Sequence, residues 1–186
     1  MSKVVDYYMS PSSPWTYLGH ARFEAIAKKA GAKVNVKPVD FGVIFPQSGG
    51  LPLAQRPAQR KAYRLAELKR WSEHLKMPLV IQPKFFPVNA TAAAELICGA
   101  PEARRMALAG DLLAALWRDD RNLADLALLA EIGSKHGASA GDKAAYEANT
   151  QEGLARQVFG APTFIYRDEL FWGQDRLDFL ERALAS

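Results

Sequence analysis

The stretch that decides the fold is MSPSSPWTYL, residues 9–18, which follows a short apolar segment at residues 4–8 and opens an amphipathic helix. Ser13 is a good N-cap, because its hydroxyl can accept a hydrogen bond from a backbone N–H of the first turn. Pro14 suits the first helical position, where its missing N–H removes no hydrogen bond. A strand that runs directly into a capped helix gathers backbone donors and the positive end of the helix dipole at one point. With serine at that point, the corner can hold a thiolate but cannot supply one.

The composition predicts one globular domain with room for an insertion. The chain has 186 residues, of which 49% are hydrophobic and 24% charged, as in ordinary soluble proteins. Its 24 Lys and Arg exceed its 20 Asp and Glu and give a formal net charge of +4, which favours anionic ligands without requiring nucleic acid. Residues 1–6 lack the apolar stretch of a signal peptide, and no run reaches transmembrane length. We therefore expect a cytoplasmic protein that binds no membrane.

Cysteine and histidine usage excludes several kinds of chemistry. Cys98 is the single cysteine, so an intrachain disulfide and dithiol redox chemistry within the chain are impossible. It lies in an apolar helical run, and we interpret it as a buried small hydrophobe rather than a nucleophile. His20, His74 and His136 are scattered, and none stands at metal-ligand spacing with another, so we expect no metal site.

The order of expected elements defines the fold class. Residues 4–8 and 33–39 read as parallel strands joined by a helix from Pro14 to about Gly31. Residues 45–57 are rich in proline and glycine and read as a loop. The expected helices of the middle are residues 58–76, 90–98, 101–117, 122–136 and 142–149. Two strands at residues 162–166 and 170–172, a hairpin turn at 167–169 and a last helix at 175–184 complete the chain.

This order of βαβ, helices and ββα predicts an α/β thioredoxin-like fold with an all-helical insertion between its two halves. We place the thioredoxin-like domain at residues 1–45 and 155–186 and the insertion at residues 46–154. No repeats or low-complexity segments are present.

Three motifs resemble signatures of the 2-hydroxychromene-2-carboxylate isomerases, which are relatives of the kappa-class glutathione transferases. The motifs are SPWTYL at residues 13–18, GAPTF at 160–164 and FWGQDRL at 171–177. Each motif alone is modest. The three together, in the right order and spacing around a helical insertion, are specific, and the resemblance covers nearly the whole chain.

The resemblance implies glutathione as cofactor. It implies that Ser13 hydrogen-bonds the glutathione sulfur and that Ala161, before a cis Pro162, pairs its backbone with the tripeptide. The residues implied near the glutamyl end are Asp175 and Arg176, and Gln174 is a further candidate for binding the cofactor. For Ser13 itself, a role as helix cap alone stays open beside the thiolate role, although the two do not conflict.

Two further cofactor positions are less clear from the resemblance. Relatives often carry an asparagine where this chain has Gly50, and a basic glutathione contact falls at Arg60 or Lys61. Arg56, Arg60 and Arg64 follow one another at intervals of four, so those on the helix share a face. That face is either a solvated helix surface or a cradle for the carboxylates of glutathione and substrate.

The segment KFFPVN, residues 84–89, and the helix start offer candidates for an aromatic substrate pocket. The candidate lining residues are Trp15, Lys84, Phe85 and Asn89. The alternative is that Phe85 and its neighbour Phe86 belong to the core.

The function implied by the resemblance is glutathione-dependent cis–trans isomerisation of an unsaturated, aromatic-derived carboxylate. The model reaction converts 2-hydroxychromene-2-carboxylate to trans-o-hydroxybenzylidenepyruvate, in the bacterial breakdown of naphthalene-like aromatics, and most relatives form homodimers. A kappa-like conjugating transferase and a non-catalytic thioredoxin-like binding module remain open as alternatives. Nucleic acid is not an expected partner, since no recognisable binding module accompanies the basic charge.

Overall fold

A four-stranded sheet forms the centre of the computed structural model, which describes residues 2–186. The strand order is β2-β1-β3-β4, with β1 parallel to β2 and antiparallel to β3, and β3 antiparallel to β4. The strands are β1 (Val4–Met9), β2 (Lys33–Pro38), β3 (Thr163–Tyr166) and β4 (Glu169–Trp172). The first two are joined by α1 (Pro14–Ala30) and the last is followed by α8 (Leu177–Ala185). The predicted thioredoxin-like fold is confirmed.

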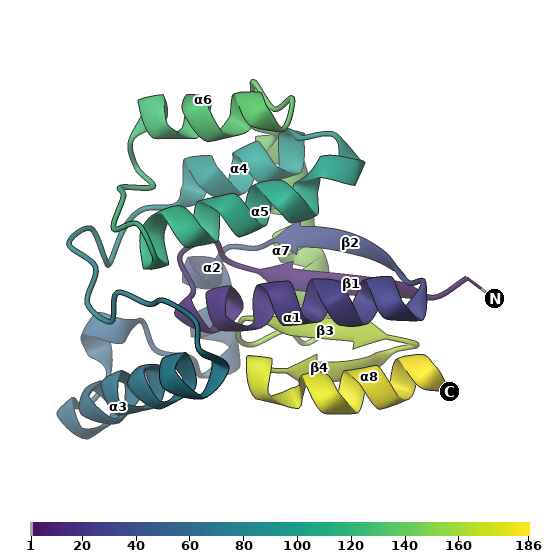
Figure 1. Ribbon diagram of the computed structural model, residues 1–186, viewed down its shortest axis with the longest axis horizontal. Helices are drawn as coiled ribbons and strands as arrows, with labels where there is room; N and C mark the ends of the chain where they lie inside the picture. The colour runs from purple at the N-terminus through teal and green to yellow at the C-terminus, as the bar shows by residue number, and fades with distance from the viewer. Residues whose placement is uncertain (1) are drawn as a thin grey trace.

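Both faces of the sheet are covered, which explains why β1 is apolar along most of its length. Val5, Tyr7 and Met9 point into the main core with residues of α1 and α8, and Figure 1 shows these two helices side by side along one face. Tyr8 points to the other face, where it packs with Val39, Ile44 and Ile165. Alternate residues of the strand therefore serve two different layers.

Six helices lie between β2 and β3. They are α2 (Phe41–Ser48), α3 (Ala58–Leu75), α4 (Thr91–Gly99), α5 (Glu102–Trp117), α6 (Leu126–Lys135) and α7 (Lys143–Ala155). Leu108, Leu112 and Trp117 of α5 are fully buried in the same cluster as Phe23 of α1. The insertion and the sheet thus share one hydrophobic core, which fixes the helices in place relative to the sheet.

The expected loop at residues 45–57 is wrong in its first part. The helix α2 runs to Ser48, and a 3₁₀ turn follows at Leu53–Gln55. Asp40 caps α2 by accepting a hydrogen bond from Gly42 N at 2.7 Å, and Ile44 is buried. Cap and burial outweigh the loss at Pro46, whose missing N–H removes one hydrogen bond of the helix. The expected boundary after residue 45 therefore falls inside a helix.

Other boundaries shift by a few residues. The helix expected from residue 122 begins at Leu126, because Asp125 is the N-cap and accepts from Ala127 N. The helix expected at residues 142–149 extends to Ala155, past the expected domain boundary at 154/155. The hairpin turn consists of Arg167 and Asp168, both with positive φ. Within residues 2–186 no helix combines the length and hydrophobicity needed to cross a bilayer.

Candidate active site

Ser13 lies where β1 passes into α1. Its backbone N–H donates to Ser10 O at 3.1 Å, which closes the turn between the two elements. Its Oγ accepts a hydrogen bond from Thr16 N at 3.2 Å, and Pro14 is the first helical residue. The predicted N-cap is confirmed. Because a hydroxyl that accepts through a lone pair keeps its own proton, Ser13 can cap the helix and donate to a ligand at the same time.

The start of α1 favours an anion. Its first turn, described in full, has no acidic residue. The backbone N–H of Trp15 has no hydrogen-bond partner among residues 2–186. The Ser13 hydroxyl and this amide are therefore two free donors at the positive end of a 17-residue helix, the arrangement that binds anions at helix N-termini.

The segment before β3 reaches the same corner. Tyr8 pairs with Thr163 in the antiparallel ladder, so continuing the register brings Pro162 opposite Met9, where the turn to Ser13 begins. The Ala161–Pro162 peptide bond is cis, as expected. In the described part of the chain neither backbone group of Ala161 makes a hydrogen bond. The backbone N–H and C=O of Ala161 can therefore pair with the backbone of a bound peptide.

The turn after β4 completes this end of the sheet. Gly173 N donates to Pro162 O at 2.9 Å, which brings the following residues to the corner. The Gln174 side chain is buried, and its Oε1 accepts from Arg22 Nη1 at 2.8 Å. Gln174 therefore has a structural contact with α1. Asp175 and Arg176 are exposed and form an ion pair with each other, so their side chains remain accessible.

A basic cluster lies on the 3₁₀ turn and α3, and Figure 1 places α2 and α3 near the end of the sheet at which α1 begins. The sequence has no Asp or Glu from residue 41 to residue 66. Burial, together with the neighbouring charge of Arg60, lowers the pKa of Arg56. Burial and the charge of Arg56 lower the pKa of Arg64 to about 10. Arg56 therefore lies close enough to both Arg60 and Arg64 for the three to form one group.

The partners of these cations differ. Lys61 Nζ donates to Ala54 O and Arg56 Nε to Leu51 O, each at 2.8 Å, so both fasten the segment between α2 and α3. Arg60 is exposed and has no hydrogen bond or ion pair within residues 2–186. Arg64 is partly buried, with its guanidinium carbon 5.1 Å from the ring centre of Phe86 and 5.9 Å from that of Trp117.

The remaining predicted site residues are placed as follows. Trp15 is partly buried against the main core. A Cβ built on Gly50 would lie 2.3 Å from Phe45 Cδ1, so an asparagine would require Phe45 to move. Lys84 Nζ lies over the Phe85 ring at 5.2 Å, and Asn89 Oδ1 accepts from Thr91 N at the start of α4. Their part in a substrate pocket stays a prediction.

The sequence reasoning did not single out Phe86 and Trp117 as partners of Arg64. Phe86, not Phe85, packs on the core, with its ring centre 4.9 Å from that of Trp117. The spacing of Arg56, Arg60 and Arg64 indicated a shared face, but it did not show what that face covers. The residues that meet it come from a loop and from the end of α5.

The environment of Cys98 differs from that of Ser13. Its side chain is 1% exposed, and Asn149 Nδ2 contacts its Sγ at 3.5 Å. Burial raises the pKa of the Cys98 thiol to about 11, and the charge of Arg105 offsets this in part. The expectation of a buried cysteine is confirmed, and its interpretation as unreactive stays a prediction.

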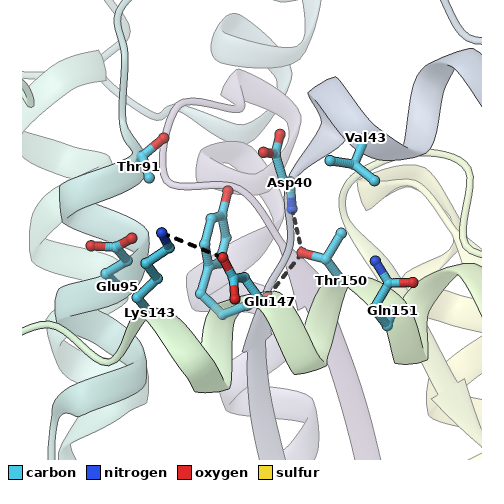
Figure 2. Close-up of a pocket in the computed structure, with 9 residues that line it drawn as sticks. Asp40, Val43, Thr91, Glu95, Lys143, Glu147, Thr150 and Gln151 are labelled. Carbon is cyan, nitrogen blue, oxygen red and sulfur yellow. Dashed lines mark hydrogen bonds and ion pairs between the residues drawn. The ribbon is translucent and has the colours of Figure 1, made fainter.

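A separate cleft of about 240 Å³ lies between α2, α4 and α7 (Figure 2). Lys143 pairs with Glu147 at 3.6 Å, and Thr150 Oγ1 accepts from Asp40 N and donates to Tyr146 O. Several of its polar groups thus serve one another or the helix ends. None of the predicted site residues lines it, and we do not assign the chemistry to it.

Comparisons with known proteins agree with this architecture. A family model described as DSBA-like thioredoxin domain matches residues 4–185. Relatives named 2-hydroxychromene-2-carboxylate isomerase, from Sphingobium xenophagum and Pseudomonas putida, are 28% and 27% identical to this chain over 195 residues. The alignments cover 99% and 97% of this chain and 99% and 94% of the relatives. The resemblance seen in the three motifs is confirmed.

Solved structures give the same result. A 2-hydroxychromene-2-carboxylate isomerase structure matches with a TM-score of 0.82 and 26% identity, over 98% of this chain and 94% of that one. The cytosolic disulfide reductase DsbM from Pseudomonas aeruginosa, solved with GSH, matches with a TM-score of 0.61 and 19% identity, over 98% of this chain and 100% of its own. At that identity the second match shows the fold alone.

Proposed function

Because this chain belongs to the DSBA-like thioredoxin domain family, we propose that it uses that fold as a glutathione-dependent cis–trans isomerase of an unsaturated, aromatic-derived carboxylate. The observation that carries the proposal is the Ser13 corner. A serine hydroxyl, a free Trp15 amide and a free Ala161 backbone lie at one end of the sheet. These groups are suited to a thiolate joined to a peptide.

The proposed substrate class is supported by the relatives, whose name is that of an isomerase of 2-hydroxychromene-2-carboxylate. The cofactor is supported by the corner itself, which offers the Ser13 hydroxyl, a free amide and the free backbone of Ala161. A disulfide exchange activity is not supported here, since Ser13 stands at the helix start and the one cysteine is buried.

Bound glutathione would supply a thiolate that adds to the substrate double bond, permits rotation about the resulting single bond and leaves again. The Ser13 hydroxyl would donate a hydrogen bond to the sulfur, and the Trp15 N–H would donate a second one. A free thiol has a pKa of about 8.5, and each unit of lowering corresponds to about 1.4 kcal/mol of preferential thiolate stabilisation. One charge-assisted hydrogen bond and a helix N-terminus are of that order.

The other groups would orient the two molecules. Ala161 would pair with the peptide backbone of glutathione, and the exposed Asp175 and Arg176 would meet its glutamyl end. Arg60 or Lys61 would attract carboxylates to the corner. A homodimer, which the family resemblance implies, and a cytoplasmic location, which the sequence pattern predicts, stay predictions.

Titration calorimetry tests the cofactor, and an absorbance assay of isomerisation tests the reaction. We expect reduced glutathione at millimolar concentration to bind, S-alkyl glutathione to compete, and isomerisation to require glutathione. Chromatography of the products separates isomerisation from conjugation, because a conjugate retains the glutathionyl group. Absence of binding heat together with absence of competition would refute glutathione dependence and favour the binding-module alternative.

A further inference from the structure

Arg64 is a charged side chain that the protein itself leaves without a counter-charge. Its guanidinium is partly buried, and no carboxylate within residues 2–186 forms an ion pair with it. It also makes no hydrogen bond to the described chain. Desolvation of an unpaired charge is unfavourable, so a structure that holds Arg64 in this way gains stability when an anion arrives.

The surroundings keep Arg64 fixed and cationic. The rings of Phe86 and Trp117 lie within cation–π distance, at 5.1 and 5.9 Å. The Trp117 side chain is fully buried and its ring packs against that of Phe86. A guanidinium held against aromatic rings keeps its planar fork of N–H donors, and that fork matches a carboxylate in two parallel hydrogen bonds.

No acidic group competes for this position. Of the cations nearby, Arg56 lies close enough to lower the pKa of Arg64, and the nearest acid along α3 is Glu67. Glu67 is paired with Arg70, with Oε1 and Nη1 2.8 Å apart. The local excess of positive charge therefore attracts an anion and repels cations.

Contacts of α1 connect Ser13 to Arg64 through neighbouring residues, and α1 and α3 are themselves in contact. Tyr17 lies one helical turn after Ser13, and its hydroxyl donates to Pro78 O at 2.7 Å. The segment after Pro78 is joined to the end of α5, because Val80 N donates to Trp117 O at 2.7 Å. A series of contacts thus links the Ser13 corner to the basic cluster. It runs from Ser13 through Tyr17, Pro78 and Trp117 to Arg64.

We propose that Arg64 binds the carboxylate of the unsaturated aromatic substrate and thereby determines which substrates bind in the correct orientation. This inference rests on the proposed function, since it assigns a substrate group to a residue that Tyr17, Pro78 and Trp117 connect to the same corner. The proposal assigns separate residues to the substrate and to glutathione. Arg64 would take the substrate carboxylate, while the glutathione contacts remain at Ser13, Ala161 and the turn at Asp175.

The test uses trans-2-hydroxycinnamate, a planar unsaturated aromatic carboxylate, and its methyl ester as the uncharged counterpart. Binding of each to the full-length protein saturated with S-methyl glutathione is measured by calorimetry. Variants are Arg64→Met and Arg64→Lys, with Arg70→Met as the matched control. Arg70 is an exposed arginine on the same helix, paired with Glu67. Circular dichroism and thermal unfolding check that each variant is folded.

We expect the wild-type protein and Arg70→Met to prefer the acid over the ester by about tenfold or more, the range for hydrogen bonds to charged groups. Arg64→Met should lose that preference and leave the dissociation constant of reduced glutathione unchanged. Arg64→Lys should keep part of the preference, since it retains charge without the planar fork. If Arg64→Met fails to fold, Arg64→Lys alone still tests the proposal through its reduced preference.

Three outcomes would overturn the assignment. The first is an unchanged acid preference in a folded Arg64 variant. The second is a wild-type protein that binds acid and ester equally. The third is a loss of glutathione affinity in Arg64→Met, which would place the cofactor, not the substrate, at Arg64. Failure of wild-type protein to bind glutathione would instead refute the proposed function, so the two failures are distinguishable.

Discussion

The Ser13 corner favours a thiolate, whereas the surroundings of Cys98 disfavour one. At Ser13 a helix begins with no acid in its first turn and with an unpaired backbone amide, so negative charge is stabilised there. At Cys98 burial raises the pKa of the thiol to about 11, and the charges of Asp142 and Glu95 act in the same direction. The chain thus buries its one thiol where a thiolate is disfavoured. The difference supports the proposed reaction with a thiol from another molecule.

Moving the thiol between these regions gives the largest expected effect. In a Cys98→Ala background, Ser13→Cys should produce a thiol of lowered pKa, as is usual at helix N-termini. A thiol with pKa about 11 is roughly 10⁻⁴ ionised at pH 7, so alkylation at position 13 should be at least about 10³-fold faster than at Cys98 of the wild type. Iodoacetamide labelling followed by mass spectrometry measures both rates. Similar rates would show that the two regions do not differ as argued.

The pH dependence of the free energy of unfolding tests the argument about Cys98. Burial raises the pKa of the Cys98 thiol from 9.0 to about 11, so the folded state binds this proton more tightly than the unfolded state. That contribution is complete below pH 9 and is lost as pH rises to 11. It amounts to about 3 kcal/mol, or roughly 10²-fold in the unfolding equilibrium.

Urea unfolding of wild type and Cys98→Ala at pH 8 and pH 10.5 isolates this effect, because other titrating groups cancel in the difference. We expect any advantage of the wild type over the variant to shrink markedly at the higher pH. A difference that is independent of pH would mean that the Cys98 thiol is not held in its neutral form by the fold.

Removing the Ser13 hydroxyl comes next in magnitude. Ser13→Ala should lower kcat/KM at pH 7 by about 10- to 100-fold, the value of one hydrogen bond to a charged group. Activity should partly recover as pH rises, because solution then ionises the cofactor thiol, and the remaining amide and helix dipole keep the loss incomplete. Ultraviolet absorbance of the bound thiolate against pH, beside the pH–rate profile, measures this.

The control for this change is Ser12→Ala, since Ser12 Oγ contacts Ser10 Oγ rather than the helix start. Loss of the cap should cost Ser13→Ala only about 0.5–2 kcal/mol of stability. Equal thiol pKa values and equal rates in wild type and Ser13→Ala would leave Ser13 as a helix cap.

The sequence predicted the fold and the Ser13 corner because their signals are local. A Ser-Pro helix start, alternating strands and a Gly-Ala-Pro segment each depend on a few neighbouring residues. The helix α2 was missed because Asp40 lies before the proline-rich stretch and caps a helix that tolerates Pro46. The environment of Arg64 could not be predicted, since Phe86 and Trp117 come from distant segments whose packing is set by the whole core.

The sequence also left open whether Arg60 or Lys61 is the basic contact for glutathione. The structure makes that choice testable. Lys61 donates to Ala54 O, whereas Arg60 is exposed and has no such contact within the described residues. We expect Arg60→Ala to raise the KM for glutathione about three- to tenfold and Lys61→Ala to raise it less. Removing an exposed charge from a cluster weakens long-range attraction that salt already screens.

Initial rates at varied glutathione, at 20 mM and 300 mM sodium chloride, measure this smallest effect. Lys69→Ala is the matched control, because it removes one positive charge from the same helix but from a side chain 3.9 Å from Glu73. The KM of Arg60→Ala should depend less on salt than that of wild type, while Lys69→Ala should resemble wild type. If Lys61→Ala has the larger effect, the lysine leaves Ala54 to reach the anion. If Arg60→Ala and Lys69→Ala behave alike, this part of α3 is a solvated surface, and glutathione binding depends on the start of α1, Ala161 and the turn at Asp175.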